Sequence, residues 1–281
     1  MALARPIGIF DSGIGGLSIL KALRAELPGE HFIYIADSGH APYGERDDAH
    51  VVERSLKMAA DLTGRNIKAL VVACNTATAA AIDVLRATYP QLPIVGVEPA
   101  LKPAVATSVT QHIAVMATRS TLASARFAAL LAAQQGQASF VLLPCDGLAE
   151  AIEQAAGHSD ATQVIAACAR ILGSAGFFED QNEPFQALKR VDTLVLGCTH
   201  YPFAAQHIAA LLGPDVTLLD TGAAVALQTR RLLAGNLSDQ PLRDISGIQG
   251  VEWFSTGQPD ALVAAAQAWL GLKADAQMLF I

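Results

Sequence analysis

Two stretches of this chain share one pattern, ALVVACNT at residues 69–76 and TLVLGCTH at residues 193–200. Each joins a short apolar run, typical of a buried strand, to a cysteine and then to a helical pattern. Ligands of open α/β sheets bind at the carboxyl ends of the strands, and N–H groups at a helix N-terminus lower the pKa of a thiol. Cys74 and Cys198 therefore predict an acid–base pair that faces one substrate from two sides.

Apolar runs alternate with helical patterns along the whole chain. The other runs that we predict as strands are residues 7–10, 32–36, 93–97, 112–118, 140–143 and 216–221. This alternation predicts an α/β fold of two similar doubly wound domains with mostly parallel sheets, and an active site in the cleft between them. We expect residues 1–98 and about 212–281 to form the first domain and residues 99–211 to form the second.

The composition narrows the class of protein. With 52% hydrophobic and 16% charged residues, the chain is unlike a disordered protein. A formal net charge of -7 argues against a nucleic-acid surface. No apolar run is long enough for a membrane span, and residues 1–6 contain no signal-peptide core. Four cysteines without C-x-x-C spacing indicate a reduced compartment, so we expect a cytoplasmic protein with a small-molecule partner.

Two polar turns follow the first two predicted strands. Asp11-Ser12-Gly13 begins a glycine-rich turn that matches neither a P-loop nor a dinucleotide fingerprint. Asp11 could cap the next helix, or the turn could hold an anion through its hydroxyl and N–H groups. Residues 37–44 could form an ordinary loop, or Pro42-Tyr43-Gly44 could present N–H groups and a ring to a ligand.

The cysteines allow three interpretations. A cysteine after a strand is commonly a small core residue. A zinc site could use Cys74, Cys198 and His200, but no ligand pair has metal-site spacing, and we expect no metal. The twin placement with polar neighbours favours acid–base chemistry instead. Cys145 and Cys168 lack such neighbours, and we expect them in the core.

The ordered motifs resemble those of the bacterial glutamate racemases, in the aspartate/glutamate racemase family. They are FDSGIGGL (10–17), ADS (36–38), PYG (42–44), ACNTA (73–77), GCTHYP (197–202) and DTG (220–222). The resemblance spans residues 7 to about 225. It implies interconversion of L- and D-glutamate without a cofactor, a supply of D-glutamate for peptidoglycan, and a homodimer.

The resemblance also implies roles for individual residues. Cys74 and Cys198 would be the two proton donors and acceptors, assisted by Asp11 and His200 respectively. The implied substrate-binding set is Asp11, Ser12, Pro42, Tyr43, Gly44, Cys74, Asn75, Thr76, Thr118, Thr121, Cys198, Thr199 and His200. Glu153 occupies the place of a glutamate linked to the second cysteine, although the prolines that often precede it in the family are replaced here by Cys145-Asp146-Gly147 and Glu150.

Three rival functions remain open on the sequence. One is a racemase of the same superfamily that acts on aspartate or a hydantoin. Another is a decarboxylase of the same architecture, which needs one cysteine only. The third is an amino-acid binding or sensor protein without turnover. His200 favours glutamate over the first rival, and the presence of both thiols argues against the other two.

Overall fold

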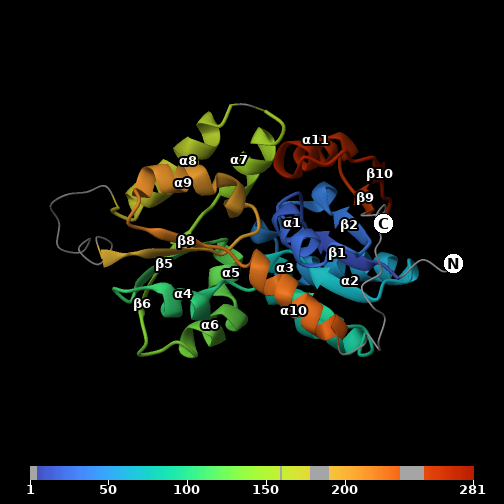
Figure 1. Cartoon of the computed structure of the whole chain (residues 1–281), viewed down its shortest axis with the longest axis horizontal. Helices are drawn as coiled ribbons and strands as arrows, with labels where there is room; N and C mark the ends of the chain where they lie inside the picture. Colours follow the sequence, from blue (N-terminus) through green and yellow to red (C-terminus); the bar gives the residue numbers. More distant parts are fainter. Residues whose placement is uncertain (1–4, 159, 178–189, 235–249) are drawn as a thin grey trace. The chain divides into compact units, whose positions relative to one another are not determined.

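The computed structural model describes residues 5–158, 160–177, 190–234 and 250–281. The chain divides into two compact units, and Figure 1 follows it through both of them. The first unit consists of Met1–Val97 and Gly222–Ile281, and the second consists of Glu98–Thr221.

The first unit contains a six-stranded sheet with the order β10-β9-β2-β1-β3-β4. All of its strand pairs are parallel. The strands are β1 (Ile7–Asp11), β2 (Phe32–Ala36), β3 (Ala69–Val72), β4 (Ile94–Gly96), β9 (Val251–Ser255) and β10 (Ala276–Met278). The strands β1, β2 and β3 are buried along their whole length, as expected for a sheet covered on both faces.

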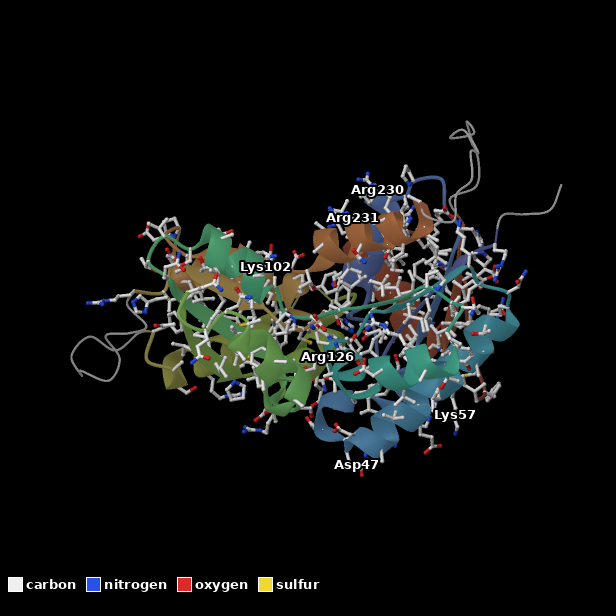
Figure 2. All side chains as sticks on the ribbon, turned by 90° about the horizontal axis from the view of Figure 1, so that it is seen from below. Asp47, Lys57, Lys102, Arg126, Arg230 and Arg231 are labelled. Carbon is white, nitrogen blue, oxygen red and sulfur yellow. The ribbon has the colours of Figure 1, made fainter. Side chains whose placement is uncertain are left out.

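The helices of the first unit pack in two groups. The first group is α1 (Leu17–Glu26), α10 (Gly222–Ala234) and α11 (Pro259–Leu270), and the second is α2 (Asp48–Gly64) and α3 (Asn75–Thr88). Arg230 on α10 forms an ion pair with Glu26 on α1, with 2.5 Å between Nη1 and Oε1 (Figure 2). The segment that returns from the second unit is therefore tied to the first helix of the chain. Two short 3-10 turns, η1 (Ser38–His40) and η2 (Tyr43–Glu45), lead from β2 toward α2.

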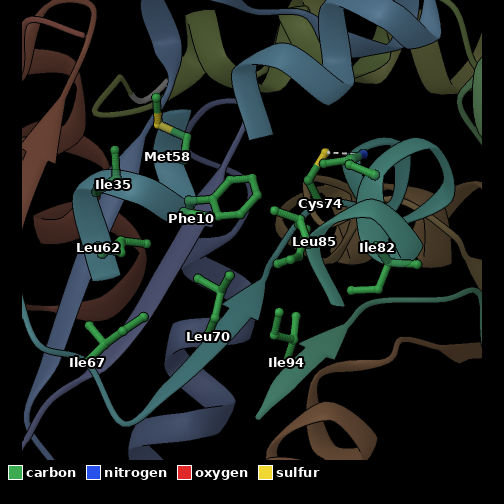
Figure 3. Packing of buried hydrophobic residues seen from close by; sticks show 14 of the residues in the cluster. Phe10, Ile35, Met58, Leu62, Ile67, Leu70, Cys74, Ile82, Leu85 and Ile94 are labelled. Carbon is green, nitrogen blue, oxygen red and sulfur yellow. Dashed lines mark hydrogen bonds between the residues drawn. The ribbon is translucent and has the colours of Figure 1, made fainter. Parts of the chain in front are cut away.

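One hydrophobic cluster supports the carboxyl end of β3. It joins Phe10, Leu70 and Ile94 of the sheet to Met58 and Leu85 of the second helix group (Figure 3). Because side chains alternate along a strand, the neighbours of Phe10 and Leu70 in their strands point to the opposite face. Cys74 belongs to the same cluster, so its position is set by packed apolar side chains.

The second unit contains a four-stranded parallel sheet with the order β6-β5-β7-β8. Its strands are β5 (His112–Ala117), β6 (Ser139–Pro144), β7 (Thr193–Leu196) and β8 (Thr217–Leu219). Its helices are α4 (Leu101–Thr107), α5 (Arg119–Ala123), α6 (Ala125–Ala132), α7 (Leu148–Ala155), α8 (Thr162–Ser174) and α9 (Ala205–Leu212), and η5 (Tyr201–Ala204) follows β7 as a 3-10 turn. The prediction of two α/β domains built on parallel sheets is confirmed.

Candidate active site

Three polar side chains of the first unit follow adjacent strands at one edge of the sheet. Phe10 of β1 lies opposite Ile35 of β2 and Val72 of β3. Two residues further along each strand stand Ser12, Asp37 and Cys74. The parallel register therefore collects them at the carboxyl edge, where open α/β sheets bind their ligands.

Cys74 is the N-cap residue of α3. Its sulfur accepts a hydrogen bond from the backbone N–H of Ala77 at 3.4 Å, drawn as a dashed line in Figure 3. The thiol also lies 3.6 Å from the hydroxyl oxygen of Ser12, and Cys74 is 5% exposed. The partial positive charge of a helix N-terminus favours a negatively charged sulfur at this position.

Asp11 holds the turn that follows β1. Its Oδ2 accepts a hydrogen bond from the backbone N–H of Gly16 at 2.7 Å, and its Oδ1 lies 3.5 Å from the Ser12 hydroxyl. A Cβ atom on Gly16 would lie 2.7 Å from Cβ of Asp11 and 2.8 Å from the hydroxyl of Tyr34, so only glycine fits there. Asp11 thus binds the backbone N–H of Gly16, the residue before α1, while it contacts the serine beside Cys74.

The side chain of Tyr43 belongs to the core. Tyr43 is 1% exposed, and its hydroxyl donates to Oδ2 of Asp37 at 2.5 Å. Burial raises the pKa of Tyr43 far above its usual value, and the negative charge of Asp37 and this hydrogen bond add to the effect. The hydroxyl of Tyr43 is therefore held by Asp37, and the backbone of residues 42–44 is the other part of this turn that could bind a ligand.

Asn75 and Thr76 form the first turn of α3, directly after the thiol. Both side chains are buried, with exposed fractions of 4% and 6%. The side-chain amide of Asn75 donates to the carbonyl oxygen of Val97 at 3.3 Å. This bond fixes the orientation of a side chain that starts the cysteine-bearing helix.

The second unit repeats this arrangement at the carboxyl edge of its own sheet. Met116 of β5 lies opposite Leu143 of β6 and Leu196 of β7. Two residues further along these strands are Thr118, Cys145 and Cys198. Cys198 and Cys74 thus occupy equivalent places in two different sheets, as the twin sequence pattern predicts.

Cys198, His200 and Glu153 form a row of polar side chains in contact. The sulfur of Cys198 lies 3.6 Å from Nδ1 of His200, and Nε2 of His200 lies 2.7 Å from Oε1 of Glu153 on α7. Burial alone would lower the pKa of His200. The hydrogen bonds and negative charges of Cys198 and Glu153 outweigh burial and raise that pKa well above 6.5. A protonated His200 carries a proton on Nδ1, which faces the sulfur of Cys198 at 3.6 Å.

Three threonines lie at the same edge of this sheet or next to Cys198 in the sequence. Thr118 caps α5, where its Oγ1 accepts from the backbone N–H of Thr121 at 3.2 Å and donates to the hydroxyl of Thr121 at 2.9 Å. Thr199 follows Cys198 directly and is 4% exposed. The structure therefore brings Thr118 and Thr121 together at the edge that also carries Cys198.

The two remaining cysteines lie in the core, as expected. Cys145 and Cys168 are 3% and 0% exposed. Burial raises the pKa of Cys145 far above its usual value and that of Cys168 to about 11. Cys145 also donates its thiol proton to the carbonyl oxygen of Leu143 at 3.1 Å. Both sulfurs therefore stay protonated at neutral pH.

The described residues contain no group of three or more histidine, cysteine, aspartate or glutamate side chains that could hold a metal ion. Among the same residues, no helix combines the length and apolar character needed to cross a membrane.

Two residues that hold the partner of Tyr43 in place are not predicted from the sequence. Arg54 of α2 and Thr256, after β9, both donate to the carboxylate of Asp37. They stand 17 and 219 positions from Asp37 in the sequence. No local spacing marks them, although an arginine among the apolar residues of an amphipathic helix is a weak signal for a buried ion pair.

Comparison with known proteins identifies relatives along most of the chain. The model of the Asp/Glu/Hydantoin racemase family matches residues 17–229. A glutamate racemase of Ectopseudomonas mendocina (strain ymp) is 44% identical over 271 residues, which cover 96% of each protein. The crystal structure of Escherichia coli glutamate racemase in complex with L-glutamate and the activator UDP-MurNAc-Ala matches with 29% identity and a TM-score of 0.81, covering 98% of both chains. Glutamate racemase of Francisella tularensis subsp. tularensis SCHU S4 in complex with D-glutamate matches with 27% identity and a TM-score of 0.77, covering 98% of this chain and 97% of that chain.

Proposed function

Because this chain belongs to the Asp/Glu/Hydantoin racemase family, we propose that it interconverts L- and D-glutamate without a cofactor, with Cys74 and Cys198 as its two acid–base groups. The observation that carries this proposal is the equivalent place of the two thiols. Each follows a strand at the carboxyl edge of a parallel sheet, and each sulfur has a nitrogen partner, the backbone N–H of Ala77 for Cys74 and Nδ1 of His200 for Cys198. The substrate follows from relatives that are named glutamate racemases, two of them with L- or D-glutamate bound.

Racemisation removes a proton from one face of the α-carbon and adds a proton to the opposite face. In one direction, the thiolate of one cysteine takes the α-proton as the C–H bond breaks, and the electron pair moves into the substrate carboxylate. The thiol of the other cysteine then gives its proton to the opposite face of the α-carbon. The reverse direction exchanges these roles, so each sulfur must exist both as thiol and as thiolate near neutral pH.

The two sulfurs have different assistants. Cys74 has the N-terminus of α3 and the hydroxyl of Ser12, which Asp11 holds in turn. Cys198 has His200, which Glu153 orients through a hydrogen bond of 2.7 Å. We therefore assign Asp11 to the first thiol, and His200 with Glu153 to the second.

The α-proton of an amino acid is very weakly acidic, so the carbanion-like state needs hydrogen bonds to the substrate carboxylate. In our proposal these come from the hydroxyl, amide and N–H groups near the two thiols. The proposed contacts are Ser12, Asn75, Thr76, Thr118, Thr121, Thr199 and the backbone of residues 42–44. No arginine is required, because helix N-termini and hydroxyl groups bind carboxylates.

In the cell, this reaction would supply D-glutamate for peptidoglycan. We propose a cytoplasmic homodimer, as the family resemblance implies.

Circular dichroism of purified protein with each glutamate enantiomer tests the proposal. We expect both enantiomers to lose their signal without added cofactor, while aspartate and a hydantoin keep theirs. Cys74→Ala and Cys198→Ala should each lower the rate by about 10²–10⁴-fold, the usual loss for an acid–base group. Cys168→Ala is the matched control and should keep its activity, because this cysteine is buried in the core. Turnover of aspartate or a hydantoin in place of glutamate would favour the corresponding rival.

A further inference from the structure

The first unit contains a buried ion pair that the acid–base chemistry does not use. Asp37 and Arg54 are 0% and 3% exposed. Arg54 donates two parallel hydrogen bonds to the carboxylate of Asp37, from Nη2 to Oδ1 at 2.8 Å and from Nε to Oδ2 at 2.9 Å. Its Nη1 donates to the backbone oxygen of Ile281 at 3.0 Å.

Two hydroxyl groups complete the surroundings of this carboxylate. Tyr43 donates to Oδ2 at 2.5 Å, and Thr256 donates to Oδ1 at 2.7 Å. Four donors thus share two oxygens, and one of the donating groups is an arginine that stays charged. Asp37 is therefore an acceptor for three neighbouring side chains.

Asp37 and the three residues that donate to it come from separate parts of the first unit. Asp37 follows β2, Tyr43 starts η2, Arg54 lies in the middle of α2, and Thr256 follows β9. Two of these parts also contact each other directly, because the backbone N–H of Gly39 donates to the side-chain Oγ1 of Thr256 at 3.1 Å. A Cβ atom on Gly39 would lie 2.6 Å from the carbonyl oxygen of Thr256. The turn between β2 and α2 is thus fixed at both of its 3-10 segments.

We infer that the Asp37–Arg54 pair is a positioning device that holds the Pro42-Tyr43-Gly44 turn in the conformation that binds the substrate. This inference rests on the proposed function. A buried ion pair adds little net stability, because desolvation offsets its attraction, but it fixes geometry through bidentate bonds. Here Asp37 transmits that geometry to the hydroxyl of Tyr43, at the centre of the turn.

The main variant is the double substitution Asp37→Asn with Arg54→Gln. Either substitution alone would leave one charge buried and unpaired, which destabilises the fold. The double variant removes both charges and keeps side chains that can hydrogen-bond each other. Tyr43→Phe is the second variant, because it removes one hydroxyl and keeps the ring.

Glu53→Gln is the matched control. Glu53 lies one residue before Arg54 on α2 and pairs with Lys57 at 3.0 Å, but its side chain is 63% exposed. Figure 2 labels Lys57 on this helix. The control therefore removes a carboxylate from the same helix without touching the turn.

Steady-state kinetics in both directions give the first test. A turn that contributes equally to substrate and transition-state binding predicts a KM that rises roughly tenfold for both enantiomers, with kcat within about twofold of wild type. Partial unfolding would instead lower kcat at unchanged KM, and so would a proton-transfer role for Asp37. Either of these results, or wild-type kinetics in the double variant and in Tyr43→Phe, would overturn the inference.

Hydrogen exchange gives a second test that needs no activity. The inference predicts faster amide exchange in peptides that cover residues 38–46 of the double variant, and wild-type exchange there in Glu53→Gln. Unchanged exchange in these peptides would overturn it. A wild-type protein that does not racemise glutamate would contradict the proposed function alone, because the exchange experiment still decides the role of the ion pair.

Discussion

Gly197→Ala is the substitution that connects the fold to the chemistry most closely. Gly197 precedes Cys198, and its N–H donates to the carbonyl oxygen of Met116 at 2.7 Å. A Cβ atom at this position would lie 2.8 Å from that same oxygen and 3.1 Å from Cβ of Ala117. Ordinary contact begins near 3.4 Å, so β7 must move away from β5 by about 0.6 Å, and the hydrogen bond must stretch.

We expect Gly197→Ala to lower both the stability of the protein and its catalytic efficiency. Overpacking of this kind destabilises by about 1–3 kcal/mol, and each kcal/mol lowers the Tm of a protein of this size by roughly 2–4 °C. The same shift displaces Cys198 and its hydrogen bond to His200, so we expect kcat/KM to fall by about 10–100-fold. Thermal unfolding measures the loss of stability, and racemisation rates in both directions measure the loss of kcat/KM.

Gly64→Ala is the control for this experiment. A Cβ atom on Gly64, the last residue of α2, meets nothing within 4 Å. This variant should keep wild-type activity, and its stability should equal or slightly exceed that of wild type, because alanine is a better helix former than glycine. A Gly197→Ala protein with wild-type Tm and kcat/KM would refute the argument that β7 and β5 approach too closely for any side chain.

Further predictions concern charge and packing. Glu153→Gln should lower the pKa of His200 in an NMR titration. Because that pKa is raised in the folded protein, the Glu153 contribution to the unfolding free energy should be complete below pH 6.5 and disappear as the pH rises through the folded-state value. Burial alone would raise the pKa of Asp192, but hydrogen bonds from Ser108 and neighbouring groups outweigh burial and lower that pKa to about 2. Its stabilisation should thus be present above pH 3.8 and lost as the pH falls through about 2, and Asp192→Ala should cost about 1–3 kcal/mol in urea unfolding at pH 7. Leu70→Ala, in the cluster below Cys74, should cost about 2–5 kcal/mol in the same assay.

The strands that carry the candidate site could be predicted because each is a buried apolar run followed by a polar turn. The last two strands of the sheet could not. β9 joins the sheet beside β2, more than 200 residues earlier in the chain, and β10 has three residues, two of them exposed. Neither the partner of β9 nor the place of β10 at the sheet edge leaves a local pattern.

In the candidate site, too, some residues could be predicted from the sequence and others could not. The thiols and their turn residues form compact motifs, so the sequence alone singles them out. Glu153 stands 47 positions from His200, in a segment that departs from the family pattern, and its bond to His200 appears only in the fold. The sequence predicts the side chain of Tyr43 as a possible ligand contact, whereas in the structure its hydroxyl donates a hydrogen bond to Asp37. Long-range partners decide such roles, and neither spacing nor composition encodes them.

Deuterium incorporation during racemisation tests the central claim most directly. L-glutamate and D-glutamate are incubated separately in deuterated water, and both enantiomers are analysed by mass spectrometry before a tenth of the substrate has turned over. Two thiols on opposite faces predict deuterium at the α-carbon of the product enantiomer and almost none in the recovered substrate, in both directions. Deuterium that enters substrate and product equally from the start would mean that one group serves both faces, and would contradict the account.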